Sequence, residues 1–261
     1  MEASANGINI CYEISGNDPH KPWVTLAHSL ACNLTMWDGA VVALATRFNV
    51  LRYDTRGHGG SSCPSGAYTF EQMAGDVVGL LDALGIERTH FVGLSMGGMI
   101  AQHLVLLTPN RIDRLVISSS TSRMPPESAP VWEVRLAKAR ELGMAALVDE
   151  TLGRWFTAGF AARHPETLAR IGQQVLSTPV AGYSGCAEAI RRLDVTARIA
   201  AIRRPTLVIV GADDPGTPSA MSETIAREIP GARLEVIPAA SHLCCIEQPE
   251  VFNRLVTDFL D

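Results

Sequence analysis

The chain has 261 residues, of which 47% are hydrophobic and 19% charged, a composition typical of a globular domain with a large buried core rather than a disordered segment. Its formal net charge is −5, and it has no basic stripe of the kind that binds nucleic acid. The amino terminus has no signal-peptide pattern and no apolar run is long enough to span a bilayer. We therefore expect a cytoplasmic protein that binds neither nucleic acid nor membrane.

The cysteines and histidines show no metal-binding pattern. No C-x-x-C pair occurs, and the histidines are scattered rather than spaced as ligands. We expect no metal and six reduced thiols: Cys11, Cys32, Cys63, Cys186, Cys244 and Cys245.

Strands and helices alternate over the first part of the chain. Period-two alternation and short apolar runs predict strands at 8–14, 23–27, 48–53, 90–93 and 115–118. Thr69 and Gln72 have the spacing of a capping box, and the apolar residues after them share one helical face. A helix is therefore predicted from there to about Leu84, and a second from about Met96 to Leu107.

The alternation stops between about Thr121 and Asp194. This stretch has helical periods at 131–142, 144–156 and 167–175. Strands resume at 206–210 and 234–237, with helices at 220–228 and after Pro249. The order predicts an α/β fold with a mainly parallel, doubly wound sheet. We expect residues 1–120 and 195–261 to form this core. Residues 121–194 would form a helical lid over the carboxyl edge of the sheet, where such folds bind ligands.

Gly93-x-Ser95-x-Gly97 lies between a predicted strand and a predicted helix. In that context the pattern is typical of a nucleophile elbow, a sharp turn that exposes the serine hydroxyl at the edge of the sheet. The glycines allow strand and helix to approach closely, and the start of the helix favours developing negative charge. Ser95 is the predicted nucleophile. Because the elbow occupies the turn that would otherwise hold a phosphate, no nucleotide cofactor is expected.

A serine nucleophile needs a histidine base and a carboxylate that orients it. In a strand–elbow–helix arrangement these follow the serine in the order acid, then histidine. Outside the elbow helix only His164 and His242 follow Ser95, and His164 falls in the helical insertion. His242 is therefore the predicted base. Either Asp213 or Asp214, which follow the strand at 206–210, could be the acid.

Elbow, late aspartate and terminal Ser-His together resemble the α/β-hydrolase superfamily. Its usual G-x-x-D-x-x-x-P pattern matches Gly211-x-x-Asp214-x-x-x-Pro218, and the resemblance assigns Asp214 as the acid. Two backbone N–H groups should form an oxyanion hole. One would come from Met96, after the nucleophile, and the other from Leu30, in a segment that resembles the superfamily's His-Gly-x.

Two histidines before the elbow are expected to be structural. His28 begins the oxyanion segment, and His58 lies in the Arg-Gly-His-Gly loop, another superfamily signature. Both precede Ser95, contrary to the chain order required of the base.

Several segments narrow the resemblance to 3-oxoadipate enol-lactonase. They are Ser29-Leu30 with Met36-Trp37, residues 51–59, Gly93 to Gly98, Arg154-Trp155-Phe156-Thr157, Gly182-Tyr183 with Cys186, Ala189-Ile190 and Leu193-Asp194. The chain departs from that family at two places: Ala31-Cys32 replaces Gly-Thr, and Met124-Pro125-Pro126 replaces a run of small residues. It also has Ser29 where the superfamily's His-Gly-x segment usually has Gly.

The resemblance implies a cofactor-free hydrolase that opens a small enol-lactone bearing a carboxylate. In a protein of net charge −5, a local cation must then attract the substrate. Trp132 and Arg135, three residues apart on a predicted helix, would place a guanidinium beside an aromatic ring. Arg154 beside Trp155 is the other candidate pair, and a solvated arginine near a core tryptophan is the alternative for both.

Two other functions use the same motifs. A general carboxylesterase or perhydrolase-like enzyme would keep the triad and take a different substrate, and a ligand receptor would keep the triad with very slow turnover. The sequence gives no indication of the oligomeric state.

Overall fold

The computed structural model describes all 261 residues and contains one sheet of eight strands. The strands are β1 (Glu2–Ala5), β2 (Ile8–Ser15), β3 (Trp23–Ala27), β4 (Asn49–Tyr53), β5 (Thr89–Leu94), β6 (Ile112–Ser118), β7 (Thr206–Gly211) and β8 (Arg233–Ile237). Their order in the sheet is β1-β2-β4-β3-β5-β6-β7-β8. β1 pairs with β2, and β2 with β4, in antiparallel orientation. The strands β3 to β8 are all parallel to one another. The predicted mainly parallel sheet is confirmed.

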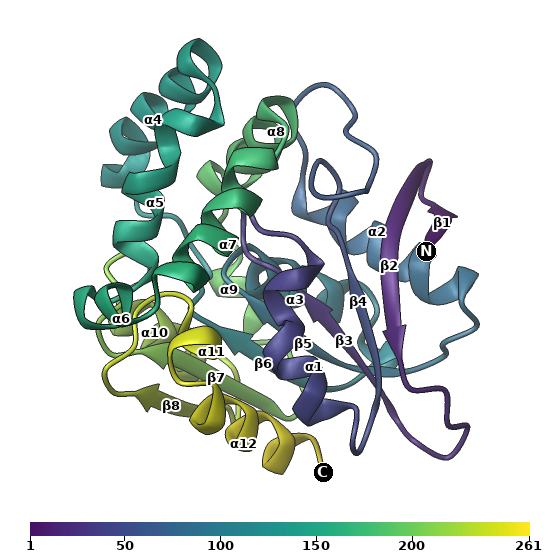
Figure 1. The fold of residues 1–261 in the computed structure, drawn as a ribbon. Helices are drawn as coiled ribbons and strands as arrows, with labels where there is room; N and C mark the ends of the chain where they lie inside the picture. The colour runs from purple at the N-terminus through teal and green to yellow at the C-terminus, as the bar shows by residue number, and fades with distance from the viewer.

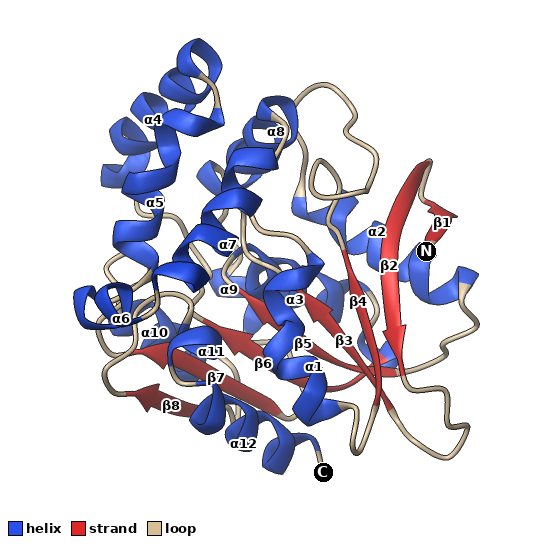
Figure 2. Ribbon diagram, in the orientation of Figure 1, coloured by secondary structure: helices blue, strands red, loops and turns tan.

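Helices cover both faces of this sheet (Figures 1 and 2). They are α1 (Asp38–Leu44), α2 (Phe70–Ala83), α3 (Met96–Leu107), α4 (Ala129–Leu142), α5 (Val148–Trp155), α6 (Ala158–Arg163), α7 (Pro165–Ser177), α8 (Val180–Arg191), α9 (Thr196–Ile199), α10 (Ser219–Glu228), α11 (Cys244–Glu247) and α12 (Pro249–Leu260). α1 packs beside α12 on one face, while α2 and α3 pack together on the other. No helix is both long and apolar enough to cross a membrane.

Local sequence signals account for the main elements. Thr69 caps α2 through the expected reciprocal box, with its hydroxyl accepting from the Gln72 N–H and its own N–H donating to the Gln72 side chain. β5 and β7 are buried along their whole length, as expected of central parallel strands covered on both faces. Their side chains join a single hydrophobic core that also includes residues of the inserted helices.

The sequence patterns did not reveal the twelve-residue helix α8, nor the two short elements β1 and α1. β1 is four residues long and pairs with β2 across a turn at Asn6-Gly7, where both residues have positive φ. α1 has seven residues and only three of them are buried. Neither element is long enough to develop a clear hydrophobic period, so pairing and packing with distant segments determine them.

The helical insertion leaves and re-enters the core at one place. Arg123 and Asp194 form an isolated antiparallel bridge, and the Met124 N–H donates to the Leu193 carbonyl at 2.9 Å. Between these ends, α4 to α8 gather beyond the carboxyl ends of the parallel strands (Figure 1). The loops that follow β3, β5, β7 and β8 open at the same edge of the sheet because the last residues of these strands are nearly in register, as in the pairs Ala27–Gly93 and Gly211–Ile237.

Candidate active site

Ser95 occupies a strained turn between β5 and α3. Its φ is 56° and its ψ −114°, a backbone conformation that a residue with a side chain rarely adopts. The flanking glycines make the turn possible. A Cβ on Gly97 would lie 2.1 Å from the Ala27 carbonyl oxygen, and a Cβ on Gly93 would lie 2.1 Å from the Gly97 oxygen. The turn thus presents the Ser95 side chain at the carboxyl edge of the sheet.

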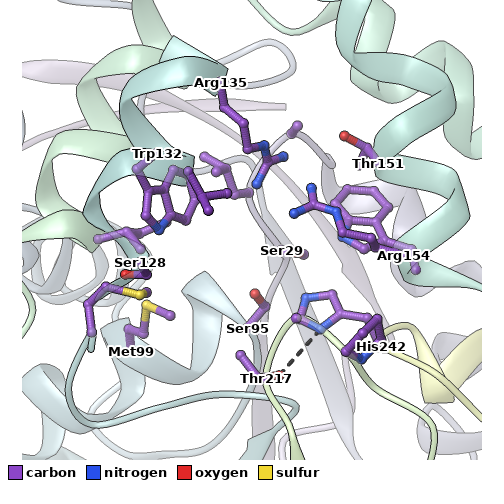
Figure 3. A pocket seen from close by; sticks show the side chains of 18 of the residues that line it. Ser29, Ser95, Met99, Ser128, Trp132, Arg135, Thr151, Arg154, Thr217 and His242 are labelled. Atoms are coloured by element: carbon purple, nitrogen blue, oxygen red, sulfur yellow. Dashed lines mark hydrogen bonds between the residues drawn. The ribbon is translucent and has the colours of Figure 1, made fainter. Parts of the chain in front are cut away.

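His242 and Asp214 meet at the same edge. His242 follows β8, Asp214 follows β7, and the His242 Nδ1 lies 2.8 Å from the Asp214 Oδ2. That contact leaves the Nε2 of the ring for another partner. Figure 3 shows the Ser95 oxygen directed toward the imidazole of His242, and both residues line one cavity. His164, the other late histidine, lies between α6 and α7 and does not line it.

Asp214 is buried and fully hydrogen-bonded, whereas its neighbour Asp213 is exposed. Its Oδ1 accepts from the backbone N–H groups of Gly216 and Thr217, and its Oδ2 accepts from the Thr217 hydroxyl at 2.6 Å. Burial alone would raise the pKa of Asp214, but the charge of His242 and the hydrogen bonds from His242 and Thr217 outweigh it and lower the pKa to about 2. The carboxylate therefore stays ionised at neutral pH and can orient the histidine.

The two residues expected to form an oxyanion hole are buried: Met96 directly follows Ser95, and Leu30 lines the same cavity as Ser95. Met96 is the first residue of α3, so its N–H has no acceptor within the helix. Neither this N–H nor that of Leu30 donates to any acceptor in the protein. Ser29 does not need the backbone of a glycine, because the left-handed residue of the segment is Ala31, with φ 61°. The substitution at Ser29 is thus compatible with the local backbone.

His28 and His58 hold the oxyanion segment in place. The His28 Nδ1 donates to the Ser29 carbonyl at 2.7 Å, and its Nε2 accepts from the Thr55 N–H at 2.9 Å. The His58 Nε2 accepts from the Ala31 N–H at 3.0 Å, and its Nδ1 donates to the Arg56 carbonyl. Burial lowers the pKa of His28 to about 4 and that of His58 to about 3, so both rings are neutral. Their contacts agree with the structural role expected for them.

This neutral pair predicts a loss of stability in mild acid. Unfolded histidines titrate near pH 6.5, so the unfolded chain binds protons that the folded chain excludes as the pH falls from about 6.5 to 4. The free energy of unfolding should decrease over this window, by about 3 kcal/mol for His28 alone. Urea unfolding between pH 7 and pH 4.5 tests this. His28→Gln should give a shallower pH dependence, and an unchanged slope would contradict the assignment.

The cavity above Ser95 has a volume of about 320 Å³ and lies between the sheet edge and the inserted helices. Its apolar lining includes Met99, Met124, Ile190 and Met221. Its charged lining consists of two arginines, Arg135 and Arg154, and one carboxylate, the exposed Glu127. The four residues predicted to contact the substrate, Trp132, Arg135, Arg154 and Trp155, all line the cavity.

The two arginines reach this cavity from different helices. Arg135 on α4 is 9% exposed, its guanidinium carbon lies 5.0 Å from the centre of the Trp132 ring, and its Nε has no hydrogen-bond partner. Arg154 is the penultimate residue of α5, and burial together with the charge of Arg135 lowers the pKa of Arg154. Figure 3 shows both guanidinium groups directed into the space above Ser95.

One carboxylate lies close to three cations in this region. The Glu150 carboxylate oxygens lie 3.7 Å from the Arg135 Nε, 3.6 Å from the Lys138 Nζ and 3.9 Å from an Arg154 guanidinium nitrogen. The cluster therefore keeps a local excess of positive charge within a protein of net charge −5. A small anion in the cavity would meet the guanidinium groups of Arg135 and Arg154, the two of these cations that line it.

Sequence reasoning missed three residues that the structure places at the site. Tyr183 lines the cavity, and its buried hydroxyl has no hydrogen-bond partner in the protein. Thr217 bonds to the Asp214 carboxylate, and Glu247 bonds to the backbone of Ser241 next to His242. The only signal for Tyr183 was its place in the Gly182-Tyr183 segment, and no local pattern pointed to the other two.

Fold and site together define a hydrolase of the α/β class. The α/β-hydrolase fold family matches residues 22–249, and the chain belongs to this family. The resemblance to enol-lactonases is also confirmed: the enol-lactonase of Burkholderia xenovorans LB400, a crystal structure, superposes with a TM-score of 0.96 at 42% identity, covering 100% of this chain and 99% of that one.

Sequence relatives span two named activities. The protein is similar to 3-oxoadipate enol-lactonase 2 of Acinetobacter baylyi, with 35% identity over 236 residues that cover 90% of this chain and 87% of the relative. It is also similar to a putative carbamate hydrolase of Stutzerimonas stutzeri, with 32% identity over 254 residues that cover 95% of this chain and 96% of the relative.

Proposed function

We propose that the protein is a serine hydrolase that opens 3-oxoadipate enol-lactone to 3-oxoadipate in the catabolism of aromatic compounds. The observation that carries this proposal is the pairing within one cavity of the Ser95–His242–Asp214 arrangement with two converging guanidinium groups. The substrate has matching parts, an activated ester and a free carboxylate. Similarity to named enol-lactonases supports the same substrate.

The reaction begins at the elbow. The Ser95 Oγ attacks the lactone carbonyl while the His242 Nε2 takes its proton, and Asp214 stabilises the imidazolium that forms. The N–H groups of Leu30 and Met96 bind the oxyanion of the tetrahedral intermediate. When the ring C–O bond breaks, the enolate oxygen takes the proton from His242 and stays tethered to the acyl chain.

Water completes the turnover. His242 accepts a proton from a water molecule that attacks the acyl-enzyme, and the Ser95 Oγ leaves with that proton. The released enol then converts to the ketone, which draws the reaction forward. The chemistry uses only side chains and backbone of this chain and water.

The inserted helices would determine which substrate binds. We propose that residues 121–194 act as a lid and that Arg135 and Arg154 bind the substrate carboxylate, with Trp132 and Trp155 as flanking walls. A guanidinium can bind a carboxylate through two parallel hydrogen bonds. The apolar lining of the cavity would hold the carbon skeleton of a small lactone.

A matched pair of substrates tests the proposal. The enol-lactone with its free carboxylate and the methyl ester of that carboxylate share the reacting ring and differ only in charge. We expect kcat/KM to be about 100-fold higher for the anionic lactone, because charged hydrogen bonds in a partly buried site contribute roughly 1.5–3 kcal/mol each. Equal rates on both substrates would point to a general esterase, and acylation without turnover would point to a receptor.

Removing one guanidinium should weaken only the anionic substrate. Arg135→Met keeps the aliphatic stem and its packing while deleting the charge. We expect KM for the anionic lactone to rise roughly 10- to 100-fold, with little change for the methyl ester. Arg140→Met, on the exposed face of the same helix, is the control and should change neither. Equal losses on both substrates would contradict a carboxylate-binding role for Arg135.

Carbamate hydrolysis is the second candidate, and the 32% identical carbamate hydrolase relative favours it. The same triad arrangement could attack a carbamate carbonyl. Release of ammonia from small carbamates, measured beside lactone hydrolysis, separates the two functions. The lactone should be the faster substrate by orders of magnitude if the two arginines of the cavity set specificity.

A further inference from the structure

Glu247 is a buried carboxylate, 7% exposed, at the end of α11. Its Oε1 accepts from the Thr157 backbone N–H at 2.8 Å and from the Thr157 hydroxyl at 2.7 Å, and its Oε2 accepts from the Ser241 backbone N–H. All three donors belong to segments that flank the site. The carboxylate is thus a bridge between two distant parts of the chain.

The two bridged segments carry opposite ends of the site. Thr157 lies two residues beyond α5, whose last residues are Arg154 and Trp155, and Ser241 directly precedes His242. Two hydrogen bonds also join these segments directly. The Ser241 hydroxyl donates to the Arg154 carbonyl at 2.8 Å, and the Leu243 N–H donates to the Trp155 carbonyl at 3.2 Å.

Side chains complete this connection. The Trp155 ring stacks on the His242 ring, with centroids 6.1 Å apart and an interplanar angle of 22°. A shift of the α5 end relative to residues 241–243 would therefore move the imidazole and the Arg154 guanidinium relative to each other. Arg135, on α4, has no part in these bonds.

We propose that Glu247 is a positioning residue that holds the His242 loop and the Arg154 end of α5 as one rigid unit. The bridge sets the distance between the base and the group that binds the substrate carboxylate, and so aligns the lactone carbonyl with Ser95. A misplacement of about 1 Å in such an arrangement can cost about 100-fold in rate. This inference rests on the proposed function, because Arg154 and His242 have these roles only there.

The chemistry of the bridge requires a carboxylate. Both oxygens act only as acceptors, and each receives a backbone N–H that cannot become an acceptor. The amide of Glu247→Gln has nearly the same shape, but its NH₂ group must face a donor on one side. The substitution therefore breaks one side of the bridge while leaving the packing volume unchanged.

The decisive measurement is the ratio of kcat/KM for the anionic lactone to kcat/KM for its methyl ester. We expect Glu247→Gln to lower this ratio about 5-fold or more, and to have no such effect in an Arg154→Met background, where the positioned cation is gone. Glu250→Gln, an exposed carboxylate on the following helix, is the matched control and should leave the ratio unchanged. A purely structural role would lower both rates equally and leave the ratio at its wild-type value, which would overturn the proposal.

Two further measurements separate the possible failures. A wild-type enzyme that a fluorophosphonate does not label at Ser95, or that shows a ratio near one, would refute the proposed function before any variant is made. A high wild-type ratio that Glu247→Gln leaves unchanged would refute the positioning role alone. If Glu247→Gln does not fold, Thr157→Val removes the hydroxyl that donates to Glu247, together with the cap that the same oxygen provides for the Phe160 N–H at the start of α6. This variant should lower the ratio about 2-fold, and an unchanged ratio would equally overturn the proposal.

Discussion

Ser95→Ala should reduce kcat for the enol-lactone by about 10⁴-fold or more, with KM changed little. The hydroxyl is the proposed attacking atom, so its loss removes the covalent pathway and leaves only binding and the two backbone N–H groups. Alanine should keep the strained turn, because the strain lies in the backbone, at φ 56°, rather than in the hydroxyl. Steady-state kinetics with both lactone substrates, together with fluorophosphonate labelling followed by mass spectrometry, measure the effect.

Ser120→Ala provides the matched control. Ser120 is fully buried, and its hydroxyl donates to the Ser95 carbonyl at 2.9 Å, so this variant changes the surroundings of the elbow without removing the nucleophile. It should lose about 1 kcal/mol of stability and keep its labelling at Ser95. Labelling that persists in Ser95→Ala, or substantial turnover by that variant, would mean that the nucleophile is a different residue.

Asp214→Asn should lower kcat by about 10⁴-fold at neutral pH, an effect as large as that expected of Ser95→Ala. The direction of the amide follows from the hydrogen bonds. The Oδ1 side faces the backbone N–H groups of Gly216 and Thr217, so the amide oxygen must stay there and the NH₂ must face the His242 Nδ1. The ring then carries its proton on Nε2 and cannot accept the proton of Ser95.

Asp213→Asn is the control for this variant. The two aspartates are adjacent, but Asp213 is exposed, and its substitution should change kcat less than about 2-fold. Comparable losses in both variants would contradict the assignment of the acid. Folding of Asp214→Asn should be checked by circular dichroism, because the carboxylate also organises the loop after β7.

Local signals predicted the framework of the fold. The buried strands, the capping box at Thr69 and the glycines around Ser95 each depend on residues within a few positions of one another. The short β1 and α1 were missed because their conformation depends on pairing with β2 and packing on α12. The sequence predicted that residues 121–194 are helical, but the division of this insertion into α4 to α8 depends on how those helices pack.

The candidate site was also predicted only in part: the sequence indicated its residues but not how all of them are arranged. Chain order singled out His242, and motif register favoured Asp214 over Asp213, a preference supported by burial and by the 2.8 Å contact with the imidazole. The pairing of Arg135 with Trp132 was visible in the sequence, whereas the Trp155 ring next to Arg154 stacks on His242. The convergence of the two arginines over Ser95 was not visible, because Arg135 and Arg154 lie on different helices whose relative placement no local pattern encodes.

By itself, the sequence determined the fold class, the elbow and the chain order of its proposed partners, because short-range periodicity and chain order carry that information. The tertiary structure alone decided which polar groups support the site. Glu247 and Thr157 are 90 positions apart, and the unpartnered hydroxyl of Tyr183 is recognisable only once its surroundings are known. Hydrogen bonds over such separations form when the sheet and the inserted helices pack against each other, and nothing in the neighbouring residues of either partner records them.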